Sequence, residues 1–405
     1  MSKILLAMTG SVATVLADKI IPALQKDGEN EVKVVMTEAA LRFANPLQLH
    51  KRHGVDVFTD VHEWSFRGDN RVVVPEGEVV WPDETNDGWS TVRGSGLWQK
   101  DQPVLHIELR KWADVLCIAP LTANTLAKMS LGLCDNLLTC VYRAWDMTKP
   151  VVVAPAMNTM MWDDEITGVQ LKSLEFKHNA YHHGVTLLAR NLFVVDPVSK
   201  RLACGDDGKG ALASISDIAD TVGQSLRWTW PMFPRACRGI PVDRHPGAFG
   251  FARRTAYHTG VDLYCSEHDS VYAVEGGTVV GINPFTGPKI NRPKWNDTDA
   301  VFVEGFSGVI NYGEIIPDRN LKVGDRLRRG QYVGKVTPVI KEGRERPDVP
   351  GHSRSMLHFE LYPHGHTDWT PWMIGETEHA QLDPTGLLLE IDGAPDPWPE
   401  FEGEL

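Results

Sequence analysis

Three residues that could do chemistry stand in short, distinctive motifs: His106 in HIELRKWAD, Asn158 in PAMNTMMW and Cys204 in ACGDDGKG. An imidazole exchanges a proton near neutral pH, a carboxamide can orient a carboxylate, and a thiol can give up its proton. Each residue alone is more often structural, as a histidine beside an apolar strand, an asparagine in a turn or an inert thiol. Residue type alone therefore leaves a shared catalytic site as one hypothesis beside these structural roles.

Two other motifs are polar turns that follow apolar runs. TGSVA offers backbone N–H groups and a hydroxyl at Gly10 and Ser11, and PLTANT offers Thr122, Asn124 and Thr125 at the start of a helix. Unpaired N–H groups and the helix dipole favour a phosphate at such a position. Two polar turns at the carboxyl ends of parallel strands are typical of a nucleotide site in a doubly wound fold.

The elements that must position these motifs alternate between strands and helices. Near-continuous apolar runs predict strands at KILLAM, EVKVVMT, ADVLCIAP and KPVVVAPAM, with helical stretches between them. Buried strands that alternate with helices predict an α/β, doubly wound parallel sheet of flavodoxin-like or Rossmann-like type. A polar insertion at about 65–102 interrupts the pattern, and its RVVV and EVVW segments could pair as a hairpin.

The C-terminal part of the chain has a different pattern, with short strand-like segments such as AVFVEGF, GVINYGEI and MLHFELY between glycine-containing turns. This pattern predicts a separate, mostly antiparallel all-β domain. The expected limits are one domain at 1–228, a linker at 229–236, the β domain at 237–391 and an acidic tail at 392–405.

Composition excludes some classes of partner. The 405 residues carry a formal net charge of −12, which argues against nucleic acid or an anionic membrane as the main partner. No apolar run is long enough to span a bilayer, and the first 20 residues lack a cleavage site of the secretory type. We expect a cytoplasmic protein.

The motifs of the first 230 residues resemble the flavin-dependent cysteine decarboxylases, and within them the branch that acts on 4′-phosphopantothenoylcysteine. The resemblance implies an FMN cofactor, a small phosphorylated substrate and a homotrimer whose flavin site lies between subunits. The positions that match cofactor contacts are Gly10, Ser11, Val12, Thr37, Glu38, Thr122, Ala123, Asn124, Thr125 and Ala156.

The same resemblance favours a shared catalytic site for these motifs and implies an oxidative decarboxylation followed by reduction, in which the flavin is the electron sink. His106 would serve as a base or positioning group, Asn158 would hold the substrate carboxylate, and Cys204 would protonate the enethiolate. Further positions match substrate contacts: Met161, Arg201, Ala203 and Leu212. The flap reads GDDGKGAL where the family usually has GDYGNGAM, so an aromatic residue and a methionine are replaced.

In the second domain, His258 and Asp262 in HTGVD and His358 in LHFEL can supply three zinc ligands with an open fourth position. The domain resembles the lysostaphin and LytM type of zinc peptidase, in its leukocyte chemotaxin branch. Glu314 and Met356 stand where those enzymes have further histidines, which favours a zinc-binding domain without peptidase activity. The resemblance also pairs Cys237 with Cys265 as a disulfide, although a cytoplasmic protein would keep both reduced.

Three other functions remain open from the sequence. A peptidyl-cysteine decarboxylase would share the flavin chemistry and differ in substrate. A regulatory protein could bind flavin without turnover, which the presence of His106, Asn158 and Cys204 disfavours. A cell-wall hydrolase would need export and the two missing histidines.

Overall fold

The computed structural model describes residues 2–63, 71–74, 90–93, 103–179, 191–202, 205–233, 239–344, 354–376, 378–391 and 394–398. Three residues of interest, Ala203, Cys204 and Cys237, lie outside these ranges, as does the EVVW segment. The chain divides into two compact units, of which the first ends at Leu226 and the second continues from Arg227.

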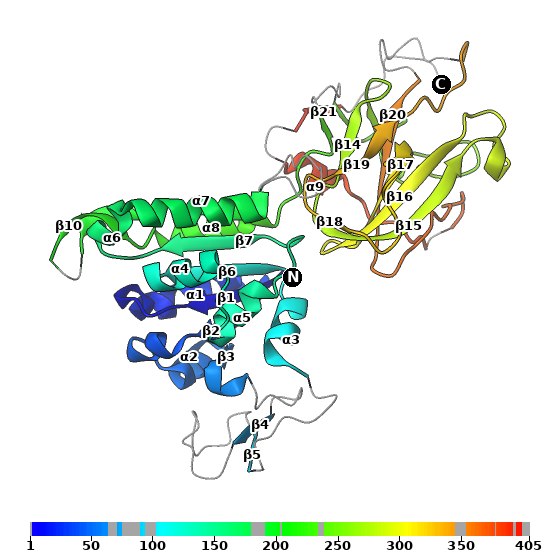
Figure 1. Cartoon of the computed structure of the whole chain (residues 1–405). Helices are drawn as coiled ribbons and strands as arrows, with labels where there is room; N and C mark the ends of the chain where they lie inside the picture. Colours follow the sequence, from blue (N-terminus) through cyan, green and yellow to red (C-terminus); the bar gives the residue numbers. More distant parts are fainter. Residues whose placement is uncertain are drawn as a thin grey trace. The chain divides into compact units, whose positions relative to one another are not determined.

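The first unit is built on a six-stranded sheet with the order β3-β2-β1-β6-β7-β8, and all of its pairings are parallel (Figure 1). Its strands are β1 (Ser2–Met8), β2 (Asn30–Met36), β3 (Asp56–Phe58), β6 (Val115–Leu121), β7 (Val151–Pro155) and β8 (Leu192–Val194). β1 and β6 are buried along nearly their whole length because helices cover both faces. The doubly wound parallel fold predicted from the sequence is confirmed.

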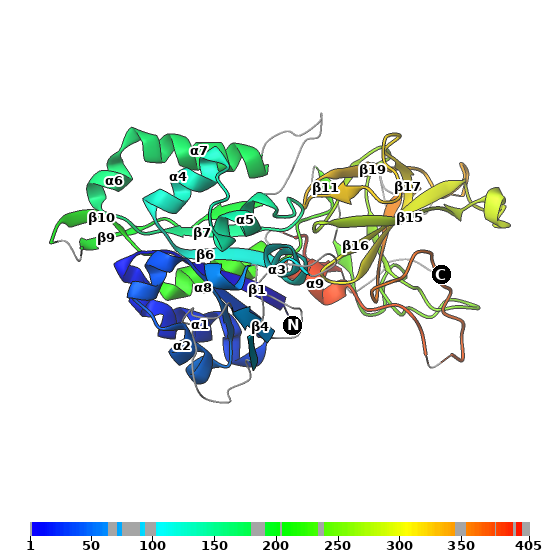
Figure 2. The ribbon, with the colours of Figure 1, turned by 60° about the horizontal axis from the view of Figure 1, so that its bottom comes forward.

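Side chains that alternate along β1 enter two different cores. Ile4, Leu6 and Met8 pack in the core that also contains residues of α1, α2 and α8, whereas Leu5 and Ala7 pack with α3, α4, α5 and α7. Figure 2 shows α4, α5 and α7 on one side of β6, and α1, α2 and α8 on the other. The helices are α1 (Ala17–Gln25), α2 (Pro46–His53), α3 (Leu105–Trp112), α4 (Ala123–Leu131), α5 (Leu137–Arg143), α6 (Thr159–Asp163), α7 (Glu165–Asn179) and α8 (Ile215–Ser225).

Two small strand pairs complete the first unit. The antiparallel pair β9 (Val198–Arg201) and β10 (Asp207–Ala211) forms the flap that the ACGDDGKG motif predicts. In the insertion, β4 (Arg71–Val74) pairs in parallel with β5 (Ser90–Arg93). The RVVV segment therefore has a later strand of the insertion as one partner, and the suggested hairpin with EVVW lies outside the described residues and stays a prediction.

The second unit contains a nine-stranded sheet in which every pairing is antiparallel. β20 pairs with both β13 and β17 at its centre. The strands are β11 (Met232–Phe233), β13 (Val261–Tyr264), β14 (Ser270–Tyr272), β15 (Gly277–Thr286), β16 (Thr298–Gly305), β17 (Val309–Pro317), β18 (Arg326–Leu327), β19 (Tyr332–Val336) and β20 (Met356–Tyr362). The predicted antiparallel β region is confirmed.

Residues at both ends of the second unit are packed. Trp228 and Trp230 are buried in its core, and β11, within the stretch expected to be a linker, pairs with β14. Near the other end, β21 (Pro397–Trp398) pairs with β12 (Ile240–Pro241), so part of the expected acidic tail is also structured. A short helix, α9 (Thr385–Leu389), precedes it. Among the described residues, no helix has the length and apolar character needed to cross a membrane.

Candidate active site and candidate metal centre

The positions expected to hold the cofactor follow the carboxyl ends of four neighbouring strands. Gly10 to Val12 follow β1, Thr37 and Glu38 follow β2, Thr122 to Thr125 follow β6, and Ala156 follows β7. The strand order reverses between β1 and β6, which is where doubly wound sheets bind ligands. The residues predicted to contact the cofactor therefore lie together at the switch point of the sheet.

A buried threonine fixes the two turns at this switch point to each other. Thr9 Oγ1 donates to the carbonyl of Pro120 at 2.7 Å and accepts a hydrogen bond from the backbone N–H of Thr122 at 3.0 Å. Ser11 caps a short 3-10 helix at Val12–Leu16, and Thr122 caps α4. The hydrogen bonds of Thr9 therefore hold the N-termini of these two helices in a fixed position relative to each other.

The hydroxyl of Thr37 is a buried polar atom at this edge that lacks a partner among the described residues. Thr37 is 8% exposed, and its Oγ1 is buried without a hydrogen-bond partner in the described part of the chain. A buried hydroxyl is normally satisfied, so an unpaired one at a candidate site points to a missing partner. The neighbouring Glu38 and Asn124 are exposed, and Val12 is 51% exposed, which leaves the edge accessible.

His106 has a carboxylate partner that the sequence did not reveal. It is the second residue of α3, and its Nδ1 forms a hydrogen bond with Oε1 of Glu63. Glu63 is 6% exposed and follows a 3-10 turn at Asp60–His62, just after β3. Because a carboxylate accepts from Nδ1–H, the pair leaves Nε2 of His106 as the atom available for chemistry.

Asn158 uses both ends of its side chain within the unit. As the N-cap of α6, its Oδ1 accepts from the backbone N–H of Met160 at 2.8 Å, and its Nδ2 donates to Oδ2 of Asp206 at 2.5 Å. Asp206 belongs to the flap, so its carboxylate occupies the amide that is expected to meet the carboxylate of a substrate. Asp206 lies in the GDDGKG stretch of the flap, where no feature of the sequence distinguishes it from the neighbouring Asp207.

The other predicted substrate contacts differ in exposure. Met161 is 54% exposed and Arg201 is exposed on β9, so both are available to a ligand. Leu212 is 4% exposed and packs in the core with residues of α1 and α8. Its side chain thus contributes to packing of the unit, and its role as a substrate contact stays a prediction, as do those of Ala203 and Cys204.

The sheet order keeps the two halves of this site apart. Glu63 follows β3 and Asn158 follows β7, and β2, β1 and β6 lie between these strands. At the usual spacing of about 4.8 Å between strands, their ends are roughly 19 Å apart. A reaction that used both His106 and Asn158 on one substrate would have to bridge this separation.

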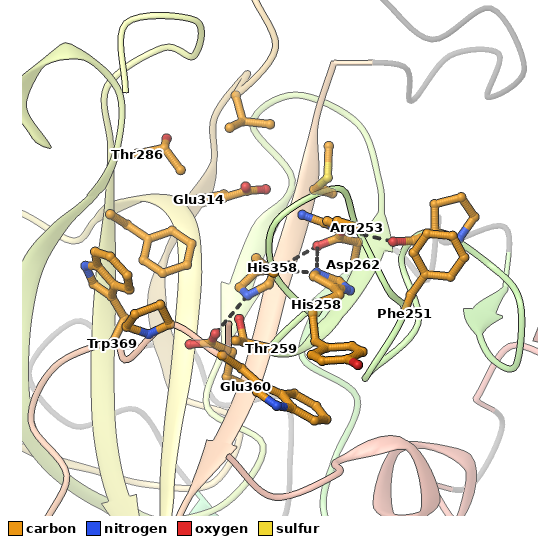
Figure 3. Close-up of a pocket in the computed structure, with 18 of the residues that line it drawn as sticks. Phe251, Arg253, His258, Thr259, Asp262, Thr286, Glu314, His358, Glu360 and Trp369 are labelled. Carbon is orange, nitrogen blue, oxygen red and sulfur yellow. Dashed lines mark hydrogen bonds and ion pairs between the residues drawn. The ribbon is translucent and has the colours of Figure 1, made fainter. Parts of the chain in front are cut away.

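In the second unit, the three predicted metal ligands come together. Asp262 on β13 lies directly opposite His358 on β20, and His258 lies in the turn before β13. Nε2 of His258 is 3.1 Å from Oδ1 of Asp262 and 3.2 Å from Nδ1 of His358, which is itself 2.8 Å from Oδ1 of Asp262 (Figure 3). Separations near 3 Å are what three ligands about 2.0–2.1 Å from one ion require.

Further groups orient these three side chains. His258 Nδ1 donates to the carbonyl of Ala248 at 2.9 Å, His358 Nε2 lies 3.1 Å from Oε1 of Glu360, and Arg253 Nη2 donates to Oδ2 of Asp262 at 3.2 Å. Such contacts fix the tautomer and leave one defined donor atom on each ligand. All three ligands are at least 94% buried.

A close approach of two chain segments allows the turn that carries His258. A Cβ added at Gly260 would lie 2.4 Å from the carbonyl oxygen of Phe359 on β20, so no other residue fits there without a shift. The glycine in HTGVD thus brings the turn against β20, next to His358.

Glu314 lies beside this cluster on a strained stretch of β17. Its φ is 65°, its side chain is buried, and its Oε2 has no hydrogen-bond partner among the described residues. Burial and then the charge of Asp262 raise the pKa of Glu314 to about 8. Burial opposes a charge on His358, but Glu360 and Asp262 outweigh it and raise the His358 pKa to about 10.

A family model described as Flavoprotein matches residues 1–227. A phosphopantothenoylcysteine decarboxylase of Arabidopsis thaliana is 42% identical over 220 residues, which are 54% of this chain and 83% of that protein. The chain belongs to the flavoprotein family. The relatives named as phosphopantothenoylcysteine decarboxylases are carboxy-lyases, and the one from Mus musculus is 35% identical over 54% of this chain and 85% of its own length.

A solved structure of the same family gives a comparable match. The FMN binding protein AtHal3 is 40% identical and covers 55% of this chain and 95% of its own chain, with a TM-score of 0.41. These matches extend over the first unit. The metal cluster lies beyond them, in the second unit.

Proposed function

We propose that the first unit catalyses the FMN-dependent decarboxylation of 4′-phosphopantothenoylcysteine to 4′-phosphopantetheine, a step of coenzyme A biosynthesis. The observation that carries this proposal is the family match over residues 1–227, together with the relatives named as phosphopantothenoylcysteine decarboxylases. The contacts of His106 with Glu63 and of Asn158 with Asp206 support this chemistry, and Cys204 belongs to the flap motif of the sequence.

The residues at the switch point fit an FMN. The unpaired hydroxyl of Thr37 offers a hydrogen bond, and the capped turns at Ser11 and Thr122 offer helix N-termini to a phosphate. FMN, when bound, takes up two electrons from the substrate and later returns them. The protein supplies binding and orientation: Asn158 holds the substrate carboxylate, and Cys204 provides a proton.

His106 acts in this proposal through Nε2, because Glu63 holds Nδ1. An imidazole fixed in this way can position the thiol end of the substrate or accept its proton. Asp206 would leave Asn158 when a substrate carboxylate arrives, and the flap would move with it. Exchange of one carboxylate for another keeps the Asn158 amide satisfied in both states.

We also propose a homotrimer, since one chain separates His106 from Asn158. Apolar side chains near the candidate site are exposed, and three of them follow one face of α7: Ile166 at 62%, Val169 at 66% and Phe176 at 72%. An exposed apolar patch of this kind is typical of a protein interface. Light scattering on the purified protein should give a mass near three chains, and a monomer that releases carbon dioxide would contradict the shared site.

Three measurements test the reaction. The purified protein should show flavin absorbance, should release carbon dioxide from 4′-phosphopantothenoylcysteine, and should leave a cysteine-terminated peptide intact. His106→Asn should abolish the release and retain flavin, because His106 is not among the phosphate-holding turns. His268→Asn is the matched control, since His268 is an exposed residue with a φ of 69°, a conformation that asparagine tolerates.

Two further substitutions separate the half-reactions. Asn158→Asp should stop carbon dioxide release, because it sets a second carboxylate against that of Asp206 and removes the amide donor. Cys204→Ser should still decarboxylate, and the oxidised enethiol should accumulate in mass spectra. Normal aminothiol product from Cys204→Ser would remove Cys204 from the mechanism.

For the second unit, we propose one zinc per chain, held by His258, Asp262 and His358, without cleavage of glycine-rich peptides. The ligand separations and the orienting contacts support the metal, and the unpaired Oε2 of Glu314 supports a further group beside the cluster. A peptidase would need two histidines that this chain replaces with Glu314 and Met356.

Elemental analysis tests the metal. Metal-replete protein should contain about one zinc per chain by the three-ligand rule, and His258→Ala should contain almost none. His364→Ala is the control, because His364 is an exposed histidine away from the cluster. Equal zinc in wild type and His258→Ala would discard the site, and hydrolysis of pentaglycine would show that catalysis is retained.

A further inference from the structure

The metal cluster of the second unit lines a pocket large enough for a small molecule. The cavity measures about 540 Å³, within the range of ordinary ligand sites. Asp262 and His358 line it together with Glu314, and aromatic side chains such as Phe285 and Trp369 supply apolar walls. Figure 3 shows Trp369 on one side of His358, and Arg253 and Phe251 on the other.

Two of the arginines that line this pocket have no acidic partner. Arg253 pairs with Asp262, but neither Arg254 nor Arg292 forms an ion pair with any residue the structure describes. Arg292 stacks instead over the ring of Trp369, 4.6 Å from its centroid, and both guanidinium groups belong to exposed residues. In a chain with a net charge of −12, free arginines at one pocket select an anionic ligand.

Besides an anionic group for the arginines, the buried part of the pocket calls for two other features in a ligand. Three protein ligands leave an open position on a zinc ion, and thiolate sulfur is among its preferred ligands. Glu314 Oε2 is buried without a partner among the described residues, so it needs a hydrogen-bonding group from whatever fills the pocket. A fitting ligand therefore carries a metal-binding head, polar groups that can hydrogen-bond to a carboxyl, and an anionic group for an unpaired arginine.

We infer that this pocket binds 4′-phosphopantetheine, the phosphorylated aminothiol that the first unit is proposed to release. Its thiol meets the metal, its amide groups meet Glu314, and its phosphate meets one of the two unpaired arginines, Arg254 or Arg292. The inference rests on the proposed function of both units. It assigns one ligand to the open metal position, the unpaired carboxylate and an unpaired arginine, and makes the second unit a receptor for the product of the first.

Cobalt-substituted full-length protein gives a readout confined to this pocket. Binding of a thiolate changes the visible d–d absorption of Co²⁺, at wavelengths longer than those of flavin, so binding in the first unit is silent. Addition of 4′-phosphopantetheine should change these bands, and its S-methyl derivative, which cannot form a thiolate, should leave them unchanged. Pantetheine, which lacks the phosphate, should bind at least about 10-fold more weakly, the equivalent of one lost charged contact.

The double variant Arg254→Ala/Arg292→Ala should bind the phosphorylated and unphosphorylated thiols with equal affinity. Arg319→Ala, an exposed arginine outside the pocket, should keep the preference. Melting curves of each variant confirm that it is folded. Equal affinity of the wild type for both thiols would overturn the role of the arginines. If inorganic phosphate competes as well as 4′-phosphopantetheine at the same concentration, the pocket recognises only an anion.

Failure of ligand binding in the second unit can be told apart from failure of the metal site and from failure of the decarboxylase activity. If His258→Ala retains as much cobalt as the wild type, the metal proposal fails and the inference falls with it. If cobalt loads at the cluster but the thiol leaves its spectrum unchanged, the metal centre stands and this inference alone is overturned. Release of carbon dioxide, measured separately, tests the first unit.

Discussion

Glu63 is the residue that orients the imidazole ring of His106. Its carboxylate is 6% exposed, and its hydrogen bond to Nδ1 of His106 fixes both the tautomer and the ring plane. The second oxygen, Oε2, is buried and has no hydrogen-bond partner among the described residues, so His106 is the partner that holds this carboxylate. Glu63 is therefore a positioning residue of the proposed decarboxylase.

We predict that Glu63→Gln lowers kcat by roughly 10- to 100-fold, a part of the 10²–10⁴ that acid–base catalysis supplies. KM should change little, because Glu63 acts on the histidine and does not touch the substrate. Single-turnover release of carbon dioxide measures the effect. Glu108→Gln is the control, because Glu108 is a surface glutamate on the same helix. A kcat equal to that of the control variant would show that the orientation of His106 does not matter.

His62 makes the stability of the first unit depend on pH. Its Nδ1 accepts from the backbone N–H of Thr59 at 2.8 Å, and burial lowers the pKa of His62 from 6.5 to about 4. The unfolded chain then binds the proton more readily, so stability is complete above pH 6.5 and is lost as pH falls toward 4. Between pH 7 and pH 5 this term amounts to about 2 kcal/mol.

The substitution His62→Gln should remove that dependence. Glutamine suits the third position of a capping box and can accept from Thr59 without titrating. Urea unfolding at pH 7 and pH 5 should show a smaller loss of stability in the variant than in the wild type. The same loss in both proteins would assign the pH dependence to other groups.

Sequence motifs located some site residues and could not locate their partners. His106, Asn158 and the ligand set at His258 stand in local patterns that can be read directly. Glu63 is 43 residues from His106, and Asp206 is 48 residues from Asn158. Only the fold brings such pairs together, and a single glutamate or aspartate has no pattern of its own.

At the scale of elements, the flap depends on one glycine. Gly210 on β10 has a φ of 145°, and a Cβ there would lie 2.4 Å from the carbonyl oxygen of Met157. The backbone N–H of Met157 donates to the carbonyl of Gly210 at 2.9 Å, so β10 is fixed directly to the loop that carries Asn158. This contact couples the position of the flap to that of the expected substrate-binding residue.

Gly210→Ala should therefore destabilise the first unit by about 1–3 kcal/mol through backbone strain, with a larger cost if the clash is not relieved. It should also raise KM, because the flap would dock less closely. Gly223→Ala on α8 is the control: its Cβ meets nothing within 4 Å, and alanine should be neutral or up to about 1 kcal/mol stabilising. Differential scanning calorimetry of both variants measures the contrast, and equal Tm values would refute it.

Apolar runs predicted the strands of both units because each strand is buried and its pattern is local. For the RVVV segment the same reasoning did not find its parallel pairing with Ser90–Arg93, because STVR is too polar to stand out as an apolar run. The stretch after Gly223 lacks periodicity, yet Trp228 is buried and its Nε1 donates to Oε2 of Glu275 at 2.7 Å. An irregular segment can be packed as firmly as a strand, and periodicity cannot detect it.

At the scale of the molecule, the two units have separate hydrophobic cores. The cores around β1 draw on residues up to 222, whereas the main core of the second unit starts at Trp228 and uses its own strands. Units with separate cores can unfold separately, and a ligand stabilises only the unit that binds it.

Calorimetry of the full chain should thus show two transitions. Saturating FMN, at about 100-fold above its Kd, should stabilise one of them by about 2.7 kcal/mol, or roughly 5–10 °C for a unit of this size. A chelator should lower only the other transition, and His258→Ala should abolish that response. A single transition that moves with both ligands would mean that the units fold as one.

The ends of the second unit are neighbours, because Ile240 and Pro241 near its start pair with Pro397 and Trp398 near its close. Trp398 also lies against His245, with 4.3 Å between the ring centroids, so this closure is packed as well as hydrogen-bonded. A module in which a strand near the start touches the last strand can be transplanted into a surface turn of an unrelated host, since its two ends lie close enough for short connections. The metal-binding β unit is therefore a natural candidate for grafting as an insert as well as for attachment at a terminus.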